Sequence, residues 1–270
     1  MMKLLQKLAA GLLVLLGACA QAQTLLKIAN NGVALDGYFY TASSSKAPAI
    51  VALHGCGGML EKRGQPNART KSYAKILNEQ GWHVLFVDSL TARGVKSVCG
   101  GNSQVTQAQR VTDVQAAVAF LAKREEVDDS RIGILGWSHG GSTALLSNDA
   151  SVDYAITPRA VVAFYPGCGD AKGRQMTWRP ARPVLMQLGA ADDWTSPIPC
   201  QSLAAQWKDL VHQDTYANAN HGFDSNGSGA ARAIQLSTPR GSKTVHTGGE
   251  PAAKSASQAK MIAFFKEHFK

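Results

Sequence analysis

Hydrophobic residues in this chain gather into short, nearly continuous runs, and the segments between several of these runs carry hydrophobic residues at helical spacing. A continuous apolar run is typical of a strand buried on both faces. The predicted strands of this series are 49–53, 82–88, 131–137, 160–165, 183–188 and 213–217. The predicted helices are 70–80, 108–123, one that begins near 142, 202–210 and one from 251 to the C-terminus. Alternating strands and helices predict one α/β domain with a mostly parallel sheet.

Two segments, 25–40 and 224–249, do not follow this pattern of continuous apolar runs. Residues 25–28 and 33–40 alternate between hydrophobic and polar positions around Asn30-Asn31-Gly32, which predicts a β-hairpin that adds antiparallel strands to the sheet. Residues 224–249 are polar and show no period, so we expect a long surface loop there.

Residues 1–22 have the features of an export signal and are not expected to belong to the domain, which then occupies 23–270. Two lysines lie near the start, and the apolar run 8–18 is too short for a stable membrane span. Small residues follow, and cleavage is predicted near Ala22. The alternative is a lipoprotein, because Leu16-Gly17-Ala18-Cys19 resembles a box in which Cys19 is lipidated, and this form would attach to a membrane.

Charge excludes one class of partner. The formal net charge of +9 falls to +7 without the two leader lysines (28 − 2 − 19). These positive charges are spread along the chain, with no basic cluster interleaved with aromatic residues, so nucleic-acid binding is not expected.

Export also changes how the cysteines are interpreted, because disulfides form in oxidising compartments. Four cysteines remain after the leader, and they allow three pairings. We favour Cys56–Cys99 and Cys168–Cys200, since each bond would join loops at the ends of neighbouring strands. The chain has no C-x-x-C or Cys/His ligand spacing, so neither a metal nor another cofactor is expected.

The strand 131–137 leads into Gly136-Trp137-Ser138-His139-Gly140 and then into a helix. This strand–turn–helix arrangement predicts a nucleophile elbow with Ser138 at its tip. Any Cβ at Gly136 or Gly140 would crowd the neighbouring strand and helix, which is why both positions need glycine.

A serine nucleophile needs a base and a carboxylate that orients it. His221 is the predicted base, because it follows the last strand in a Gly/Asn loop where strand ends converge. Asp192 is the predicted acid, directly after strand 183–188, and Asp193 is its rival and should point away. The order nucleophile, acid, base agrees with this architecture. Asp170 and Asp224 are assigned to loop solvation or turn hydrogen bonds.

The other histidines receive structural roles. His54 and His139 are expected to shape the site, His83 to lie in the core or on a strand face, and His212, His246 and His268 to lie at the surface. Trp137, Trp194 and Arg93 are candidates for lining the substrate pocket, with core packing or a surface charge as the alternative.

Attack on an ester or amide generates an oxyanion that needs preorganised donors. The predicted donors are the backbone N–H groups of His139 and of Cys56, which lies in the loop 54–58. The alternative is a glycine turn with no catalytic part.

The motifs Gly136–Gly140, Gly189–Asp192 and His221–Asp224 together resemble those of the dienelactone hydrolase family of α/β-hydrolases, from about residue 25 to the C-terminus. The chain is most similar to an exported branch that carries Tyr165-Pro166-Gly167-Cys168 and a paired Cys200. The resemblance implies an α/β-hydrolase fold with helices on both faces of the sheet, and a triad of Ser138, Asp192 and His221. The founding enzymes use a cysteine nucleophile and a glutamate near the oxyanion loop, so lactone specificity of their kind is not implied.

The sequence therefore predicts a periplasmic or secreted serine hydrolase that cleaves a small-molecule carboxylic ester or lactone through an acyl-enzyme. One alternative is an exopeptidase of the related prolyl-peptidase group, although the chain lacks an added propeller or a long lid. The other is an envelope binding protein on a hydrolase scaffold, although such scaffolds usually lose triad members and none is missing here. The sequence does not determine the oligomeric state.

Overall fold

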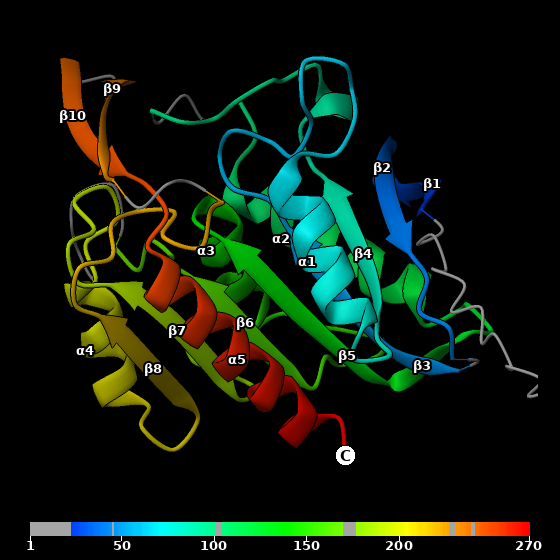
Figure 1. Ribbon diagram of the computed structural model, residues 1–270. Coiled ribbons are helices and arrows are strands. Elements are labelled where there is room, and N and C mark those ends of the chain that lie inside the picture. Colours follow the sequence, from blue (N-terminus) through cyan, green and yellow to red (C-terminus); the bar gives the residue numbers. More distant parts are fainter. Residues whose placement is uncertain (1–22, 45, 101–103, 170–176, 227–229, 239–240) are drawn as a thin grey trace, which may run out of the picture.

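An eight-stranded mixed sheet runs through the structure, a computed structural model that describes residues 23–44, 46–100, 104–169, 177–226, 230–238 and 241–270 (Figure 1). The strands lie in the order β1-β2-β4-β3-β5-β6-β7-β8. They are β1 (Gln23–Asn30), β2 (Val33–Tyr40), β3 (Ala47–Leu53), β4 (His83–Asp88), β5 (Val127–Trp137), β6 (Ala160–Phe164), β7 (Val184–Gly189) and β8 (Val211–Tyr216). The pairs β1/β2 and β2/β4 are antiparallel, and all other neighbours are parallel. The predicted α/β class and the N-terminal hairpin are therefore confirmed.

Helices cover both faces of this sheet. The helices α1 (Ala68–Asn78) and α5 (Pro251–His268) lie on the face nearer the viewer in Figure 1. The helices α2 (Gln107–Leu121), α3 (His139–Ser147) and α4 (Ile198–Gln206) pack on the other face. A short 3₁₀ helix, η1 (Thr91–Arg93), follows β4. The resulting architecture is that of an α/β-hydrolase.

The two hydrophobic cores explain why the central strands are continuously apolar. In β3, Val51 and Leu53 point toward α2, α3 and α4, whereas Ile50 and Ala52 point toward α1 and α5. Successive side chains of a strand alternate between its faces, and here both faces are buried. Each predicted strand of the parallel series overlaps an observed strand.

The helix predicted for 202–210 lies closer to the N-terminus in the structure. The observed helix α4 starts at Ile198, with Pro199 in its first turn, and ends at Gln206. Proline is tolerated in the first turn of a helix because its missing N–H would have no partner there. The end is set by the sheet, because Val211 pairs with Val184 of β7 and draws the chain into β8.

The expectation of a surface loop over 224–249 was wrong. Within it, β9 (Arg232–Thr238) and β10 (Gly241–Thr247) form an antiparallel hairpin that stands apart from the main sheet (Figure 1). Its strands are short and mostly exposed, and its buried hydrophobic residues are Leu236 and Val245. A hairpin with so few apolar positions gives almost no alternating signal, so the sequence pattern resembled a loop.

Residues 1–22, which carry both the predicted export signal and the lipidation alternative at Cys19, lie outside the described residues. Among the helices of the described part of the chain, none is long and apolar enough to cross a membrane.

Candidate active site

The turn between β5 and α3 places Ser138 at the carboxyl edge of the sheet. Ser138 has φ 54° and ψ −119°, a strained conformation for a residue with a side chain. Its backbone N–H donates to the Phe164 carbonyl oxygen at 2.9 Å, which ties the turn to β6. A Cβ on Gly136 would lie 2.2 Å from the Gly140 carbonyl oxygen, and one on Gly140 would lie 2.2 Å from that of Leu53. Both glycines are therefore required for this turn, as the sequence predicted.

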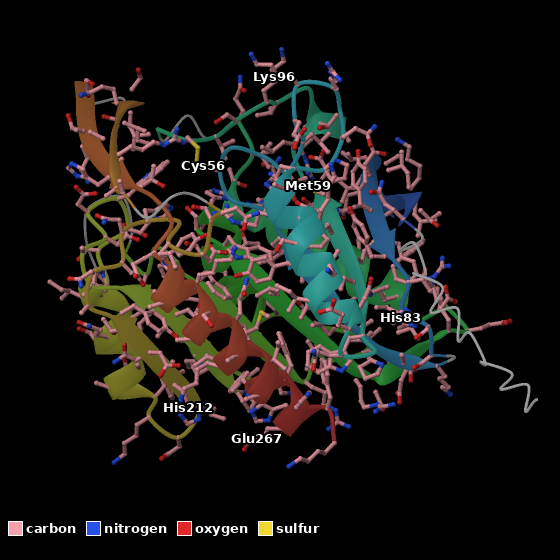
Figure 2. All side chains as sticks on the ribbon, viewed as in Figure 1. Cys56, Met59, His83, Lys96, His212 and Glu267 are labelled. Carbon is pink, nitrogen blue, oxygen red and sulfur yellow. A yellow bond between two sulfur atoms is a disulfide. The ribbon has the colours of Figure 1, made fainter. Side chains whose placement is uncertain are left out.

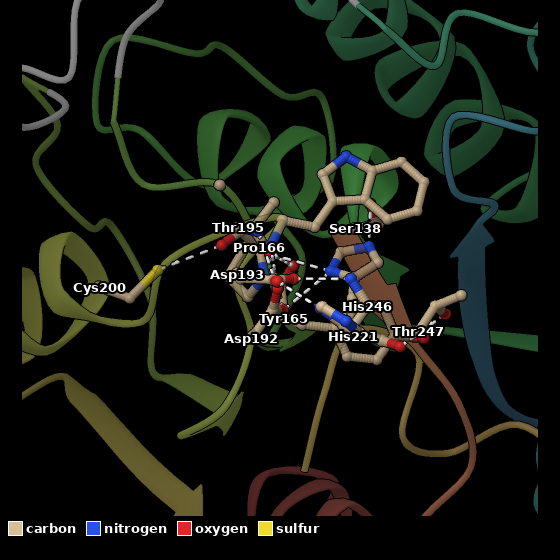
Figure 3. A network of polar contacts seen from close by, with 12 residues as sticks. Ser138, Tyr165, Pro166, Asp192, Asp193, Thr195, Cys200, His221, His246 and Thr247 are labelled. Carbon is tan, nitrogen blue, oxygen red and sulfur yellow. Dashed lines mark hydrogen bonds and ion pairs between the residues drawn. The ribbon is translucent and has the colours of Figure 1, made fainter. Parts of the chain in front are cut away.

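Three side chains from separate strand ends form a continuous line of hydrogen bonds (Figure 3). The Ser138 Oγ lies 2.9 Å from the His221 Nε2, and the His221 Nδ1 lies 2.8 Å from the Asp192 Oδ2. All three residues are at least nine-tenths buried. The structure thus brings together the three residues that the sequence selected as nucleophile, base and acid.

Asp192 is held by several donors in addition to His221. Its Oδ1 accepts hydrogen bonds from the backbone N–H groups of Trp194 at 2.9 Å and Thr195 at 2.8 Å. Asp193 points away, toward the hairpin, where its Oδ2 lies 2.7 Å from the exposed His246 Nδ1 (Figure 3). The geometry therefore favours Asp192 over its rival.

Thr195 is a member of the site that the sequence reasoning missed. Its Oγ1 lies 2.9 Å from the Asp192 Oδ2, 3.0 Å from the Tyr165 carbonyl oxygen and 3.1 Å from the His221 Nδ1. A threonine three residues after an aspartate is a common partner in a local side-chain turn, which was the available signal. The hydroxyl helps to keep the carboxylate and the imidazole in one orientation.

Two aromatic rings hold the His221 imidazole in place. Trp194 lies at 4.6 Å between ring centroids, and Tyr165 makes an edge contact at 4.7 Å. Trp194 also lines the cavity beside Ser138, and its contact with a substrate stays a prediction. Trp137 instead packs in the core, which was its structural alternative. The Arg93 side chain is only 12 % exposed and forms an ion pair with the buried Asp113 at 2.7 Å, so Arg93 neither lines the cavity nor is the surface charge that was its alternative.

The assignment of Asp224 to loop solvation or turn hydrogen bonds was wrong, because Asp224 is 2 % exposed and its carboxylate binds residues far away in the chain. Its carboxylate accepts from the Tyr165 hydroxyl at 2.6 Å, the Trp137 indole N–H at 2.9 Å and the Arg69 guanidinium at 3.3 Å. Burial raises the pKa of the Tyr165 phenol well above its usual range, so this hydroxyl stays a donor. Since Asp224 lies three residues after His221, the network anchors the loop that carries the base. The other outsider, Asp170, lies outside the described residues.

We expect Asp224→Ala to lower the free energy of unfolding by about 3 kcal/mol, because two buried donors, Tyr165 and Trp137, and the partly exposed Arg69 lose their common acceptor. Asp224→Asn keeps one acceptor oxygen and should cost less. Urea unfolding measures both, with the exposed Asp209→Ala as the control for removing a carboxylate. Equal stability of Asp224→Ala and Asp209→Ala would contradict the role of this network.

A cavity of about 250 Å³ opens beside Ser138. Its walls include the apolar side chains of Val98, Val105 and Trp194, together with the polar side chains of Gln107 and His139. The cavity is large enough for a small organic group next to the Ser138 hydroxyl.

The proposed oxyanion donors lie on the same cavity. Cys56 and His139 both line it, and a Cβ built on Gly55 would be 3.6 Å from the Ser138 Cβ. Among the described residues, neither the Cys56 nor the His139 backbone N–H has an acceptor. Both N–H groups are therefore available to a bound oxygen, and their role as oxyanion donors stays a prediction.

Disulfides join Cys56 to Cys99 and Cys168 to Cys200, with Cα–Cα distances of 4.9 and 5.1 Å. This is the pairing that the sequence favoured. Figure 2 shows Cys56 at the end of the molecule opposite His212 and Glu267. The first bond attaches the loop 54–58 to the segment that closes one side of the cavity.

The other histidines are not placed to act as the base. Burial and the neighbouring Arg110 guanidinium lower the pKa of His54 well below its usual range and that of His139 to about 4, so both stay neutral. His83 is buried between a backbone donor and a backbone acceptor, as expected for a core residue. His212 and His246 are exposed, and His268 is half-buried against Phe264. In the part of the chain that the structure describes, no cluster of side chains could hold a metal ion.

The sheet, the elbow and the histidine after the last parallel strand define an α/β-hydrolase. A model of the dienelactone hydrolase family matches residues 35–269, and the chain belongs to this family. Family membership and fold together support a hydrolase. A comparison with curated proteins found no match.

Solved structures share this fold at low sequence identity. A dienelactone hydrolase candidate from Klebsiella pneumoniae is 15 % identical with a TM-score of 0.69, covering 92 % of this chain and 99 % of that one. The dienelactone hydrolase-like promiscuous phosphotriesterase P91 from metagenomic libraries is 20 % identical with a TM-score of 0.68, covering 93 % and 100 %. Esterase 2 of Thermogutta terrifontis, phosphorylated by paraoxon, is 17 % identical with a TM-score of 0.62, covering 90 % and 92 %.

Proposed function

We propose that this protein is an exported serine hydrolase that cleaves small carboxylic esters or lactones through an acyl-enzyme. The hydrogen-bonded line from Ser138 through His221 to Asp192, at the mouth of a small cavity, carries this proposal. The fold shared with an esterase and a phosphotriesterase supports it, because both act on ester bonds.

In the proposed reaction, the His221 Nε2 takes the proton of the Ser138 hydroxyl while the Ser138 Oγ attacks the ester carbonyl carbon. The Asp192 carboxylate accepts the Nδ1–H and stabilises the imidazolium that forms. The backbone N–H groups of Cys56 and His139 bind the oxyanion, and each such donor is typically worth about 3 kcal/mol in the transition state. His221 then protonates the leaving alcohol.

Water completes the cycle by the same groups in reverse. His221 removes a proton from water, the hydroxide adds to the acyl carbonyl, and the Ser138 Oγ leaves and regains its proton. The overall products are the alcohol and the carboxylic acid, and the enzyme is regenerated. The proposed reaction consumes only the ester and water and needs no cofactor.

Export is the second part of the proposal. The two disulfides are consistent with an oxidising compartment. We propose that residues 1–22 are removed near Ala22 and that residues 23–270 form the mature domain. The mass of the mature N-terminus distinguishes this cleavage from lipidation at Cys19.

Nitrophenyl esters test the reaction. We expect the purified mature protein to hydrolyse acetyl and butyryl esters much faster than palmitoyl esters, because the cavity of about 250 Å³ fits a short acyl group. A fluorophosphonate should label one residue, and peptide mass spectrometry should locate it at Ser138. Turnover of dipeptide substrates without turnover of esters would instead favour the exopeptidase alternative. Absence of both turnover and labelling would favour the binding scaffold.

A further inference from the structure

Arg110 is a fully buried cation next to the site, and the proposed reaction gives it no role. It projects from α2, and its two terminal nitrogens bind different parts of the site. One nitrogen lies 2.8 Å from the His139 Nδ1, and the other donates to the His54 carbonyl oxygen at 2.8 Å. Its Nε has no partner among the described residues. Removing the Arg110 charge from water lowers the stability of the fold, and an apolar side chain of similar length would avoid this cost.

The Arg110 contact determines where the His139 imidazole carries its proton. A guanidinium has donors and no acceptor, and although burial lowers the pKa of Arg110 to about 10, it stays charged at neutral pH. The His139 Nδ1 must therefore be the acceptor. Burial and the charge of Arg110 lower the pKa of His139 to about 4, so the ring is neutral and its proton lies on Nε2.

With its Nδ1 on Arg110, His139 has its Nε2–H left for the cavity. The Nδ1 faces the buried Arg110, whereas the Nε2, on the other side of the Cε1 atom, has its N–H directed away from Arg110; the side chain is half-buried and His139 lines the cavity beside Ser138. No hydrogen bond joins this Nε2 to another of the described residues. A side-chain donor thus faces the space that a substrate would fill.

The same guanidinium also holds the other half of the oxyanion site. Arg110 donates to the carbonyl oxygen of His54, the residue that begins the loop 54–58 with Cys56. The His54 ring is also held by hydrogen bonds. Its Nδ1 lies 2.7 Å from the Gly55 carbonyl oxygen, and its Nε2 accepts from the Ser89 N–H at 3.2 Å. Arg110 therefore connects the two segments that carry the proposed backbone donors.

We propose that Arg110 is a positioning residue that aligns both oxyanion segments and turns a neutral His139 Nε2–H into the cavity, where it binds a second oxygen of the substrate. The preferred substrates are then esters with an ether, hydroxyl or carbonyl oxygen close to the scissile ester group. This inference rests on the proposed function, since it names the substrate class of the same site.

Pairs of esters that differ by one oxygen test the substrate class. The acyl pair is nitrophenyl methoxyacetate against nitrophenyl butyrate, and the alcohol pair is methoxyethyl acetate against butyl acetate. Within a pair, the ratio of kcat/KM values in the wild type is compared with the ratio in His139→Phe, so that intrinsic reactivity cancels. We expect a change of about tenfold in one pair, the worth of one hydrogen bond, and recovery in His139→Gln, which restores an N–H donor. Unchanged ratios in both pairs would overturn the proposal.

Nitrogen NMR of histidine-labelled protein tests the positioning without any substrate. We expect the Nε2–H tautomer for His139 in the wild type and a mixture of tautomers in Arg110→Met. The variant should also lose about tenfold in kcat per active site titrated by fluorophosphonate, with KM unchanged. Arg124→Gln, which removes an arginine from a half-exposed ion pair with Glu126, should match the wild type in both measurements.

An Nδ1–H tautomer in the wild type would overturn the proposal even if Arg110→Met did not fold. Wild-type kcat in a folded Arg110→Met would do the same. Failure of the proposed function differs from both outcomes, because no ester would then be hydrolysed by any variant while the tautomer would still be measured.

Discussion

Ser138→Ala should lower kcat/KM for nitrophenyl acetate by about a millionfold, because the triad acts as a unit and the nucleophile has no substitute. The Ser138 Oγ is the atom closest to the His221 Nε2 in the hydrogen-bonded line, at 2.9 Å. Steady-state hydrolysis by the purified variant measures the loss, and fluorophosphonate labelling should disappear with it.

The fold should tolerate this change, since only one oxygen atom is removed from the turn. A thermal unfolding curve that overlaps the wild-type curve would separate the loss of chemistry from the loss of structure. Ser255→Ala, on the exposed side of α5, is the matched control and should keep full activity. If Ser138→Ala retained a tenth of wild-type turnover, Ser138 could not be the nucleophile.

Asp192→Asn should lower kcat by about ten-thousandfold. The substituted amide can donate to the His221 Nδ1, which would then act as an acceptor and leave the proton on Nε2. A protonated Nε2 cannot take the proton of the Ser138 hydroxyl, whose Oγ it faces at 2.9 Å. The pH dependence of single-turnover acylation of the variant measures this effect directly.

Asp193→Asn is the matched control for this prediction. Its carboxylate pairs with His246 near the surface, where both side chains are close to half exposed, and such pairs contribute little to stability. We expect wild-type kcat for this variant. If Asp193→Asn were the damaging change and Asp192→Asn the neutral one, the acid would have been assigned to the wrong residue.

The sequence contained enough information to select the residues that the structure brings together. The glycines of the elbow, the apolar strand before it and the strand ends before Asp192 and His221 are all local patterns. Because parallel strands place their carboxyl ends at one edge, their order along the chain already implied that these side chains meet. The catalytic roles themselves stay predictions until the variants are measured.

The sequence did not reveal the groups that support these residues. Thr195, Asp224 and Arg110 each contact residues far away in the chain, and Thr195 in addition forms a local turn with Asp192. Arg110 is 29 residues from His139 and 56 from His54, and Asp224 is 87 from Trp137. In a sequence, a buried polar residue whose partner is distant cannot be told apart from a polar residue exposed to solvent. The burial of Asp224 and Arg110 was therefore not predicted.

By itself, the sequence determined the strand and helix series and the order of the three site residues, because periodicity and turn chemistry are properties of neighbouring positions. It favoured one of three cysteine pairings, and the structure contains that pairing. Only the tertiary structure decided that Asp224 is buried, that residues 232–247 pair as a hairpin and that Arg110 faces His139. These features depend on which surfaces meet after folding. The residues in contact are far apart in the sequence, so no periodic pattern along the chain predicts them.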